Sequence, residues 1–230
     1  MSSHEQDGRA APLRIVAATV AFAVVHSVLA SRAAKQRTER ALGERARAGW
    51  YRAFYNAQAV ATSAALLAYG RSLPDRTLWR ARGATAVLLR VGQLAGLAWG
   101  AWAARTVGIG AMSGAASVMA WARGDGVVPR EPEAQGPAPS SAPGDGGVHA
   151  RGPFAWSRHP LNWAPVPVLW LHPHMTANLA AFNAAATLYL VAGSWHEETR
   201  LRAAYGAAYE TYRRSGVAFW WPGQRGGAAA

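Results

Sequence analysis

The sequence predicts an all-α membrane protein, a polytopic helical bundle with about five transmembrane helices. Three observations lead to this fold class. Hydrophobic residues make up 51% of the 230 residues and charged residues only 16%, below the roughly 25% of an average soluble protein. The apolar residues gather in blocks long enough for a spanning helix, which needs about 20 residues. Arginine-rich connectors separate the blocks and give the chain a net charge of +12.

The first three expected spans follow a polar leader at residues 1–12. Residues 13–31 form the first span, and residues 53–70, which carry no charge, form the second. Residues 84–104 form the third, which only Arg90 interrupts. Each block is close to the length that the hydrocarbon core of a bilayer requires.

A C-terminal helical hairpin supplies the last two expected spans. Residues 161–195 contain no Asp, Glu, Lys or Arg and are long enough for two passes, with the tip at residues 171–174. Pro165 and Pro167 predict an irregular first leg, because proline lacks a backbone hydrogen-bond donor and interrupts a helix.

The other segments differ in composition. Residues 105–121 are expected to form an interfacial helix, which completes an N-terminal part at residues 13–123. A Gly/Pro-rich insert at residues 124–150 cannot build a core and is expected to be disordered. Residues 151–222 hold the hairpin and the tail that follows it, and residues 223–230 form a flexible end.

Positive charge sets the expected orientation. The connector at residues 31–52 carries seven basic residues against two glutamates, which places it in the cytoplasm by the positive-inside rule. The C-terminus is then cytoplasmic, as in a protein of the inner membrane of a bacterium. Residues 71–83 lie outside, although they carry four arginines against Asp75. The alternative is a soluble helical bundle with an aromatic core.

The composition excludes several kinds of chemistry. The chain has no cysteine, so disulfides, thiolate metal sites and cysteine nucleophiles are ruled out, and we expect no metal. We expect no nucleic-acid partner either, because the arginines flank apolar helices instead of forming one continuous patch. The expected partners are the lipid bilayer and a small molecule.

Polar side chains bracket the hairpin. Arg158 and His159 precede it, and Glu197 and Glu198 follow it. If the run crosses the membrane and returns, both ends lie at one surface, where they can hold a zwitterionic ligand. Proline pushes the residue before it out of helical geometry and suits the first helical position, so we expect a helix to begin at Pro160. A basic anchor at the membrane edge is the alternative.

Aromatic residues follow the two glutamates. Tyr205, Tyr209 and Tyr212 lie at i, i+4 and i+7 and therefore share one helix face, as do Glu197 and Leu201. This stripe has two interpretations. It can lie against lipid headgroups as part of an interfacial helix, or it can wall a pocket for a flat ring.

Spaced motifs in both halves of the chain resemble those of a known family. The C-terminal third holds, in order, Gly152-Pro153-Phe154, Ser157-Arg158-His159-Pro160-Leu161, Glu197-Glu198, Leu201, Gly206, Tyr209, Tyr212 and Pro222. This order resembles the isoprenylcysteine carboxyl methyltransferase-like membrane enzymes, which include phospholipid methyltransferases. The N-terminal half holds His26-Ser27-Val28-Leu29-Ala30-Ser31, Lys35, Trp50-Tyr51-Arg52 and Tyr55-Asn56. It is similar to the NnrU-like and methanethiol S-methyltransferase branch.

The resemblance implies a membrane methyltransferase that depends on S-adenosylmethionine, which its cytoplasmic C-terminal tail binds. It assigns His159, Pro160 and Leu161 to the cofactor pocket. Glu197 and Glu198 would face the amino end or the ribose of the cofactor. Arg158 would contact the cofactor's carboxylate or orient the substrate. Leu201 would belong to the pocket, and Tyr209 and Tyr212 would lie beside the adenine.

The acceptor implied by the resemblance is a small thiol or a lipid-like molecule that enters from the bilayer near His26. Histidine titrates near neutrality, so His26 can deprotonate a thiol; equally, it can be a packing residue bonded to a neighbouring helix. The chain departs from the family at Asn162, where tyrosine is frequent, and at His196, where a basic residue is frequent. The alternative function is a non-catalytic NnrU-like membrane protein linked to nitrogen-oxide metabolism.

Overall fold

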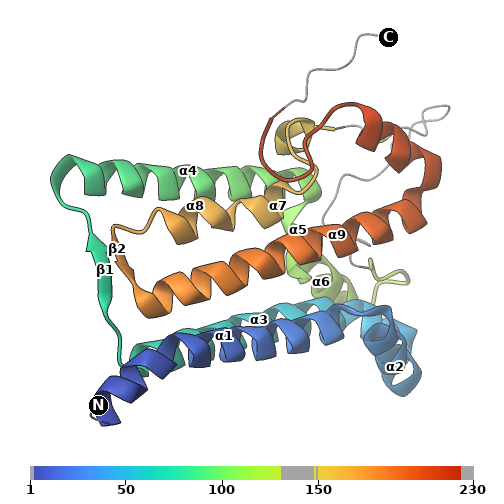
Figure 1. Cartoon of the computed structure of the whole chain (residues 1–230). Helices are drawn as coiled ribbons and strands as arrows, with labels where there is room; N and C mark the ends of the chain where they lie inside the picture. Colours follow the sequence, from blue (N-terminus) through green and yellow to red (C-terminus); the bar gives the residue numbers. More distant parts are fainter. Residues whose placement is uncertain (1–2, 131–147, 149, 224–230) are drawn as a thin grey trace. The chain divides into compact units, whose positions relative to one another are not determined.

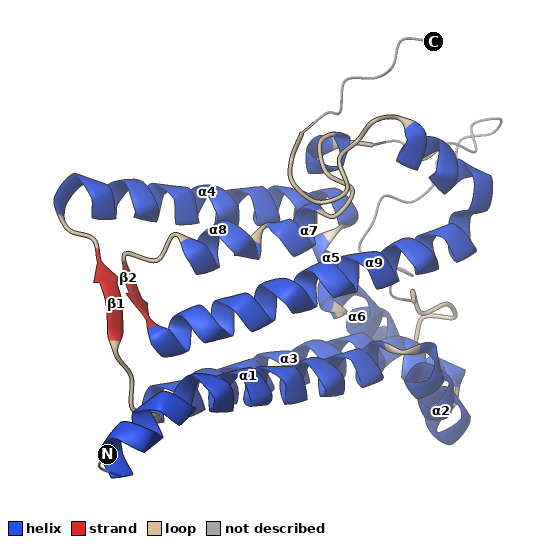
Figure 2. Ribbon diagram, in the orientation of Figure 1, coloured by secondary structure: helices blue, strands red, loops and turns tan. Residues whose placement is uncertain are grey.

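The computed structural model describes residues 3–130, 148 and 150–223, and it is mostly helical (Figure 1). Two short strands, β1 and β2, pair in an antiparallel sheet that the all-α expectation did not include (Figure 2). In chain order the elements are α1 (Ser3–Ala30), α2 (Arg32–Leu42), α3 (Glu44–Ser72), β1 (Thr77–Arg80), α4 (Gly83–Val107), α5 (Ile109–Ser113), α6 (Ala115–Arg123), the 3-10 helix η1 (Gly152–Ala155), α7 (Pro160–Trp163), α8 (Pro165–Trp170), β2 (His174–Thr176) and α9 (Ala177–Arg214).

Two helices of the described chain are long enough and apolar enough to cross a membrane. They are Ala10–Ala30, within α1, and Gly83–Val107, which is α4. These helices cover the first and third expected spans. The remaining expected spans and the hairpin are not confirmed, because length and composition single out neither α3 nor the segment at residues 161–195 in the part of the chain that is described. The first leg of that segment is divided into α7 and α8, as its prolines predict.

The chain divides into two compact units. Unit 1 comprises Met1–Leu88, Gly110–Glu131 and His172–Tyr189. Unit 2 comprises Leu89–Ile109, Pro132–Leu171 and Leu190–Ala230.

In unit 1, α1 and α3 run side by side (Figure 1). A methyl group built on Gly70 of α3 would lie 3.1 Å from the side chain of Ile15, so glycine allows the two helices to approach here. The hydroxyl of Tyr51 donates to the carbonyl of Leu29 over 2.6 Å. Both contacts fix the register of the pair.

The expected interfacial helix at residues 105–121 is interrupted by two glycines with positive φ, Gly108 and Gly114. In unit 1, Arg52 and Asn56 of α3 donate to the carbonyl of Met112 over 2.7 and 2.9 Å. These donors satisfy carbonyl groups that the end of a helix leaves unpaired. Gly114 lies so close to Ala53 that a side chain would collide with its backbone nitrogen.

The connector at residues 71–83, which was expected only to lie outside the membrane, contains β1. The strands pair in unit 1 with Thr77 opposite Thr176 and Arg80 opposite His174. The carboxylate of Asp75 accepts a hydrogen bond from the backbone nitrogen of Asn178 over 3.0 Å. This contact caps the start of α9, because the first N–H groups of a helix have no partner within it.

In unit 2, small residues of α4 face α7 and α8. Methyl groups built on Gly92 and Gly96 would lie 2.3 and 2.6 Å from the side chains of Leu171 and Pro167. Leu171 can move its flexible end away, but the Pro167 ring cannot, so the close approach of α4 and α8 depends on glycine at Gly96. The amide of Gln93 donates to the carbonyl of Val168 over 2.6 Å and joins the same helices.

Three segments that the sequence sets apart, the leader, the insert and the C-terminal end, are described only in part. Helix α1 begins at Ser3, so most of the leader at residues 1–12 is helical. Most of the insert at residues 124–150 lies outside the described residues, as does nearly all of the end at residues 223–230. The described start of the insert includes Gly124, which ends α6 with φ of 78°.

Candidate functional site

The site is built on two loops of unit 2 that hydrogen bonds hold together. The backbone nitrogen of Arg158 donates to the carbonyl of Ala218 over 2.9 Å. The hydroxyl of Ser157 donates to the carbonyl of Trp220 over 2.9 Å and accepts from the backbone nitrogen of His159. These bonds fix the backbone on both sides of Arg158, whose side chain enters the site.

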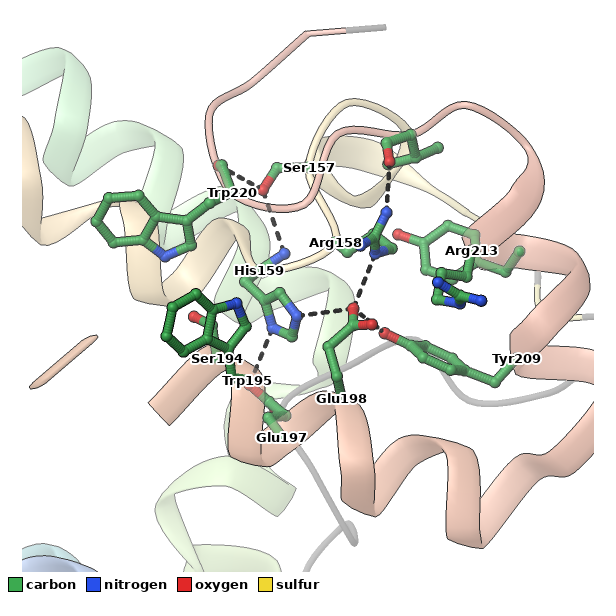
Figure 3. A network of polar contacts seen from close by, with 12 residues as sticks. Ser157, Arg158, His159, Ser194, Trp195, Glu197, Glu198, Tyr209, Arg213 and Trp220 are labelled. Atoms are coloured by element: carbon green, nitrogen blue, oxygen red, sulfur yellow. Dashed lines mark hydrogen bonds and ion pairs between the residues drawn. The ribbon is translucent and has the colours of Figure 1, made fainter. Parts of the chain in front are cut away.

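Helix α7 begins at Pro160, as predicted. His159 precedes it with φ of −125° and ψ of 56°, outside helical geometry. This is the restriction that a proline imposes on the residue before it. The turn directs the imidazole of His159 toward α9, where Glu197 and Glu198 lie (Figure 3).

His159 lies between the two carboxylates. Its Nδ1 is 3.3 Å from Oε2 of Glu197, and its Nε2 is 3.1 Å from Oε1 of Glu198. The side chain of His159 is 1% exposed, that of Glu197 13% and that of Glu198 7%. The structure therefore brings together the two ends of the apolar run, which are almost 40 residues apart. These three residues, with Arg158, are called the His159 cluster below.

Glu198 accepts three hydrogen bonds at one oxygen. Arg158 Nε and the hydroxyl of Tyr209 each donate to Oε1 over 2.8 Å, in addition to His159 (Figure 3). Burial alone would raise the pKa of Glu198, but the bonds from His159, Arg158 and Tyr209 outweigh it and lower the pKa to about 2. Glu198 is therefore a carboxylate at neutral pH.

His159 responds to the same charges in the opposite direction. Burial alone would lower the pKa of its imidazole, yet hydrogen bonds and charges from Glu197 and Glu198 outweigh burial and raise the pKa above 6.5. Two carboxylates next to one ring favour the protonated form, in which both nitrogens donate.

Asn162, which had no expected role, holds Glu197 and is itself bonded to Ser194. The amide nitrogen of Asn162 lies 3.1 Å from Oε2 of Glu197 and 3.0 Å from the hydroxyl of Ser194. Asn162 was noted only as a departure from the family. The sequence could have indicated this role, because a position three residues after His159 places the amide of Asn162 on the first turn of α7.

Arg158 is held by more than its bond to Glu198. Its Nη1 donates to the carbonyl of Val217 over 2.8 Å, and its guanidinium carbon lies 5.5 Å from the ring centre of Phe219. The same ring packs edge-on against His159 at 5.1 Å. Phe219, another residue that the sequence analysis did not single out, thus covers both basic side chains.

The tyrosine stripe does not lie on one straight helix. Gly206 has φ of 51° and ψ of −127°, so α9 is kinked between Tyr205 and Tyr209. Tyr209 and Tyr212 are buried with Leu201 and Val217 in one hydrophobic cluster, and the hydroxyl of Tyr212 donates to the carbonyl of Phe154 over 2.7 Å. Both tyrosines pack in the core of unit 2, and their place beside an adenine stays a prediction.

The other candidate residues lie as follows. Pro160 is buried at the start of α7, and Leu161 beside it is partly exposed. His26 lies in unit 1, on α1, where its Nε2 contacts the hydroxyl of Tyr55 on α3. Its Nδ1 is buried and makes no hydrogen bond within the described residues. In that part of the chain, no three His, Cys, Asp or Glu side chains are placed to hold a metal ion.

Comparison with known proteins gives one local similarity. Over 61 residues the chain is 39% identical to a Mycobacterium tuberculosis protein named methanethiol S-methyltransferase. The aligned stretch covers 26% of this chain and 25% of that protein. No family model matches the chain. No solved structure matches it.

Proposed function

We propose that the chain is an integral membrane methyltransferase that uses S-adenosylmethionine and acts on a small thiol or a lipid-like acceptor. The observation that carries the proposal is the local similarity to a protein named methanethiol S-methyltransferase. Two helices of membrane-spanning length support a place in the bilayer. The His159 cluster supplies a site with both signs of charge.

The donor set of the cluster fits a zwitterionic cofactor. Glu197 keeps a partly exposed carboxylate, which suits an ammonium group or ribose hydroxyls. Arg158 uses Nε and Nη1 within the protein, and its planar fork leaves Nη2 to bind a carboxylate. When bound, S-adenosylmethionine supplies a methyl group on a positively charged sulfur.

The protein's own part in such a reaction is positioning. His159 and Asn162 fix the Glu197 carboxylate, and Glu198 fixes Arg158. Burial of these charges keeps water away and strengthens their interaction with a ligand. Holding two reacting groups in line can supply several kcal/mol of rate acceleration, about 7–11 in the best cases. A thiol acceptor must also lose its proton, and His26 Nδ1 is our candidate to accept it.

Binding and turnover test the proposal separately. The full chain, purified in detergent, is titrated calorimetrically with S-adenosylmethionine and with its demethylated product. Membranes that contain the chain are then incubated with methyl-labelled cofactor and a panel of thiols and lipids. We expect binding of both forms of the cofactor and label in one class of acceptor. If neither form binds, the proposal is wrong.

One observation favours the alternative of a non-catalytic NnrU-like membrane protein. Glu198, Tyr209 and Tyr212 are buried and bond to other residues of unit 2, which is how a purely structural ion-pair network is arranged. A protein of this kind would keep the His159 cluster and bind no cofactor. The same titrations separate the two functions.

A further inference from the structure

Unit 1 contains a cavity that the proposed cofactor site does not use. It has a volume of about 100 Å³. Helices α1 and α3 and the N-terminal third of α9 line it, all within unit 1, and the side chain of Leu67 at its edge is 46% exposed. Its lining residues are Thr19, Phe22, Ser63, Leu66, Leu67, Phe182, Ala186 and Tyr189.

The lining determines which molecules can enter. None of the lining side chains carries a charge. The hydroxyl of Thr19 is already bonded to the carbonyl of Ile15 over 2.8 Å, and the hydroxyl of Tyr189 to that of Ser27 over 3.0 Å. Transfer of a charged group into such surroundings is unfavourable because nothing replaces its hydration. The cavity therefore suits an uncharged molecule with mostly hydrocarbon surface.

The volume limits the size of the occupant. A water molecule takes up about 30 Å³ in the liquid, and an apolar cavity of roughly 150 Å³ accepts benzene. A space of about 100 Å³ can hold only a few heavy atoms. We propose that this cavity is a binding site for a small uncharged apolar molecule, such as a short alkane thiol.

The position of the cavity connects an occupant to a titratable side chain. Phe22 and Tyr189 line the cavity, and each also contacts the ring of His26, at 5.4 and 6.2 Å between ring centres. A molecule in the cavity lies one side chain away from that imidazole. That the bound molecule is the methyl acceptor rests on the proposed function. That a small apolar molecule binds in the cavity does not depend on it.

Ethanethiol is the probe for the binding test. It is titrated into the purified full chain with ¹³C-labelled Leu and Ala methyl groups, followed by NMR. We expect saturable shifts at the methyl groups of Leu66, Leu67 and Ala186. Cysteamine has the same two-carbon thiol with an added ammonium group, and we expect it to cause no such shifts because the cavity offers no counter-charge.

Three variants locate the site. Ala186→Phe fills the cavity and should weaken ethanethiol binding by at least about tenfold, whereas Ala184→Phe, on an exposed position of the same helix, should leave it unchanged. Leu66→Ala enlarges the cavity and should shift the preference from ethanethiol toward butanethiol. The Leu66→Ala variant keeps the test informative if Ala186→Phe does not fold.

The outcomes separate this proposal from the proposed function. Absence of saturable shifts, or equal binding of cysteamine, overturns the cavity site even if the chain transfers methyl groups. Contacts from detergent acyl chains to the Leu67 and Ala186 methyl groups would also overturn it, because the bilayer would then be the occupant. Binding of ethanethiol without any methyl transfer upholds the cavity and rejects the enzyme.

Discussion

Glu197 and Glu198 are neighbours in the chain, yet their carboxylates have different surroundings. Glu198 accepts from Arg158, His159 and Tyr209 at a single oxygen. Glu197 contacts His159 and the amide of Asn162 and is the more exposed of the two. We infer that Glu198 holds the cluster together, and that Glu197 is the carboxylate that a ligand can reach.

Glu197→Gln tests this division of roles. The substitution keeps the size of the side chain and removes its charge, so a charge-assisted contact to the cofactor is lost. We expect the Kd for S-adenosylmethionine, measured by calorimetry, to rise about tenfold or more. Glu210→Gln is the control, because Glu210 pairs with Arg202 and Arg213 instead of with Arg158 or His159. An unchanged Kd in Glu197→Gln would place the cofactor elsewhere.

The His159 cluster also predicts how stability depends on pH. The pKa of His159 is raised from 6.5 in the folded protein, so its contribution is complete below pH 6.5 and disappears as the pH rises through the raised value. The pKa of Glu198 is lowered from 4.5 to about 2, so its contribution is complete above pH 4.5 and disappears as the pH falls toward 2. Both contributions are complete between about pH 4.5 and pH 6.5, so the thermal unfolding midpoint should be highest in that range.

His159→Gln is the variant that checks the upper limit. It removes the titrating imidazole, so the decrease of the unfolding midpoint above pH 6.5 should become smaller while the decrease on the acid side persists. His196→Gln serves as the comparison, because His196 is an exposed residue that directly precedes Glu197 on α9. If both variants keep the wild-type profile above pH 6.5, His159 is not the group responsible.

The kink in α9 is a property of the helix as a whole. Gly206 has a positive φ with ψ of −127°, a combination that essentially only glycine adopts. Gly206→Ala should therefore lower the free energy of unfolding by about 1–3 kcal/mol. Gly193→Ala, in the helical part of α9, should be neutral or stabilise by up to about 1 kcal/mol.

The two glycines are a matched pair. A methyl group added at either position meets no atom within 4 Å, so packing is unchanged and the difference reports backbone strain alone. Denaturant unfolding in detergent provides the comparison. Equal effects of the two substitutions would show that α9 runs straight through Gly206 in solution.

Local rules explain which elements could be predicted from the sequence. Pro160 fixed the start of α7, and the prolines after it predicted a broken first leg, because proline acts on its immediate neighbours. The kink at Gly206 escaped prediction because the spacing of Tyr205, Tyr209 and Tyr212 suits a continuous helix. Strand β1 escaped because its partner β2 is almost 100 residues away, and only tertiary pairing orders so short a strand.

The same limit applies to the site. Opposite charges at Arg158, His159, Glu197 and Glu198 pointed to one cluster, but the sequence could not show which atoms pair. The structure directs Arg158 and Tyr209 at Glu198. The roles that the resemblance implies for them, Arg158 at the cofactor's carboxylate or the substrate and Tyr209 beside the adenine, stay predictions. Burial decides such pairings, because a buried carboxylate requires donors from within the protein.

For the whole molecule, the decisive feature is the outward direction of apolar side chains. Large hydrophobic residues are exposed along both candidate membrane helices, on α1 at Val20, Val24 and Val28 and on α4 at Val87, Leu88, Val91 and Leu94. On a soluble protein, rows of large exposed apolar side chains along a helix usually mark a surface that a partner or a membrane covers. In a bilayer the same side chains face lipid, and their exposure carries no cost.

Leu94→Asp and Val24→Asp test the location of these helices. At the centre of a membrane helix an aspartate costs about 2.5–3.5 kcal/mol, so we expect both variants to reduce the fraction of the protein that resists alkaline carbonate extraction of membranes. Leu42→Asp is the control, because Leu42 is equally exposed but lies at the end of α2, outside both spans. On the surface of a soluble protein such substitutions usually change stability by less than about 0.5 kcal/mol. Three variants with wild-type behaviour, and a chain that carbonate releases completely, would therefore remove the bilayer from the proposed function.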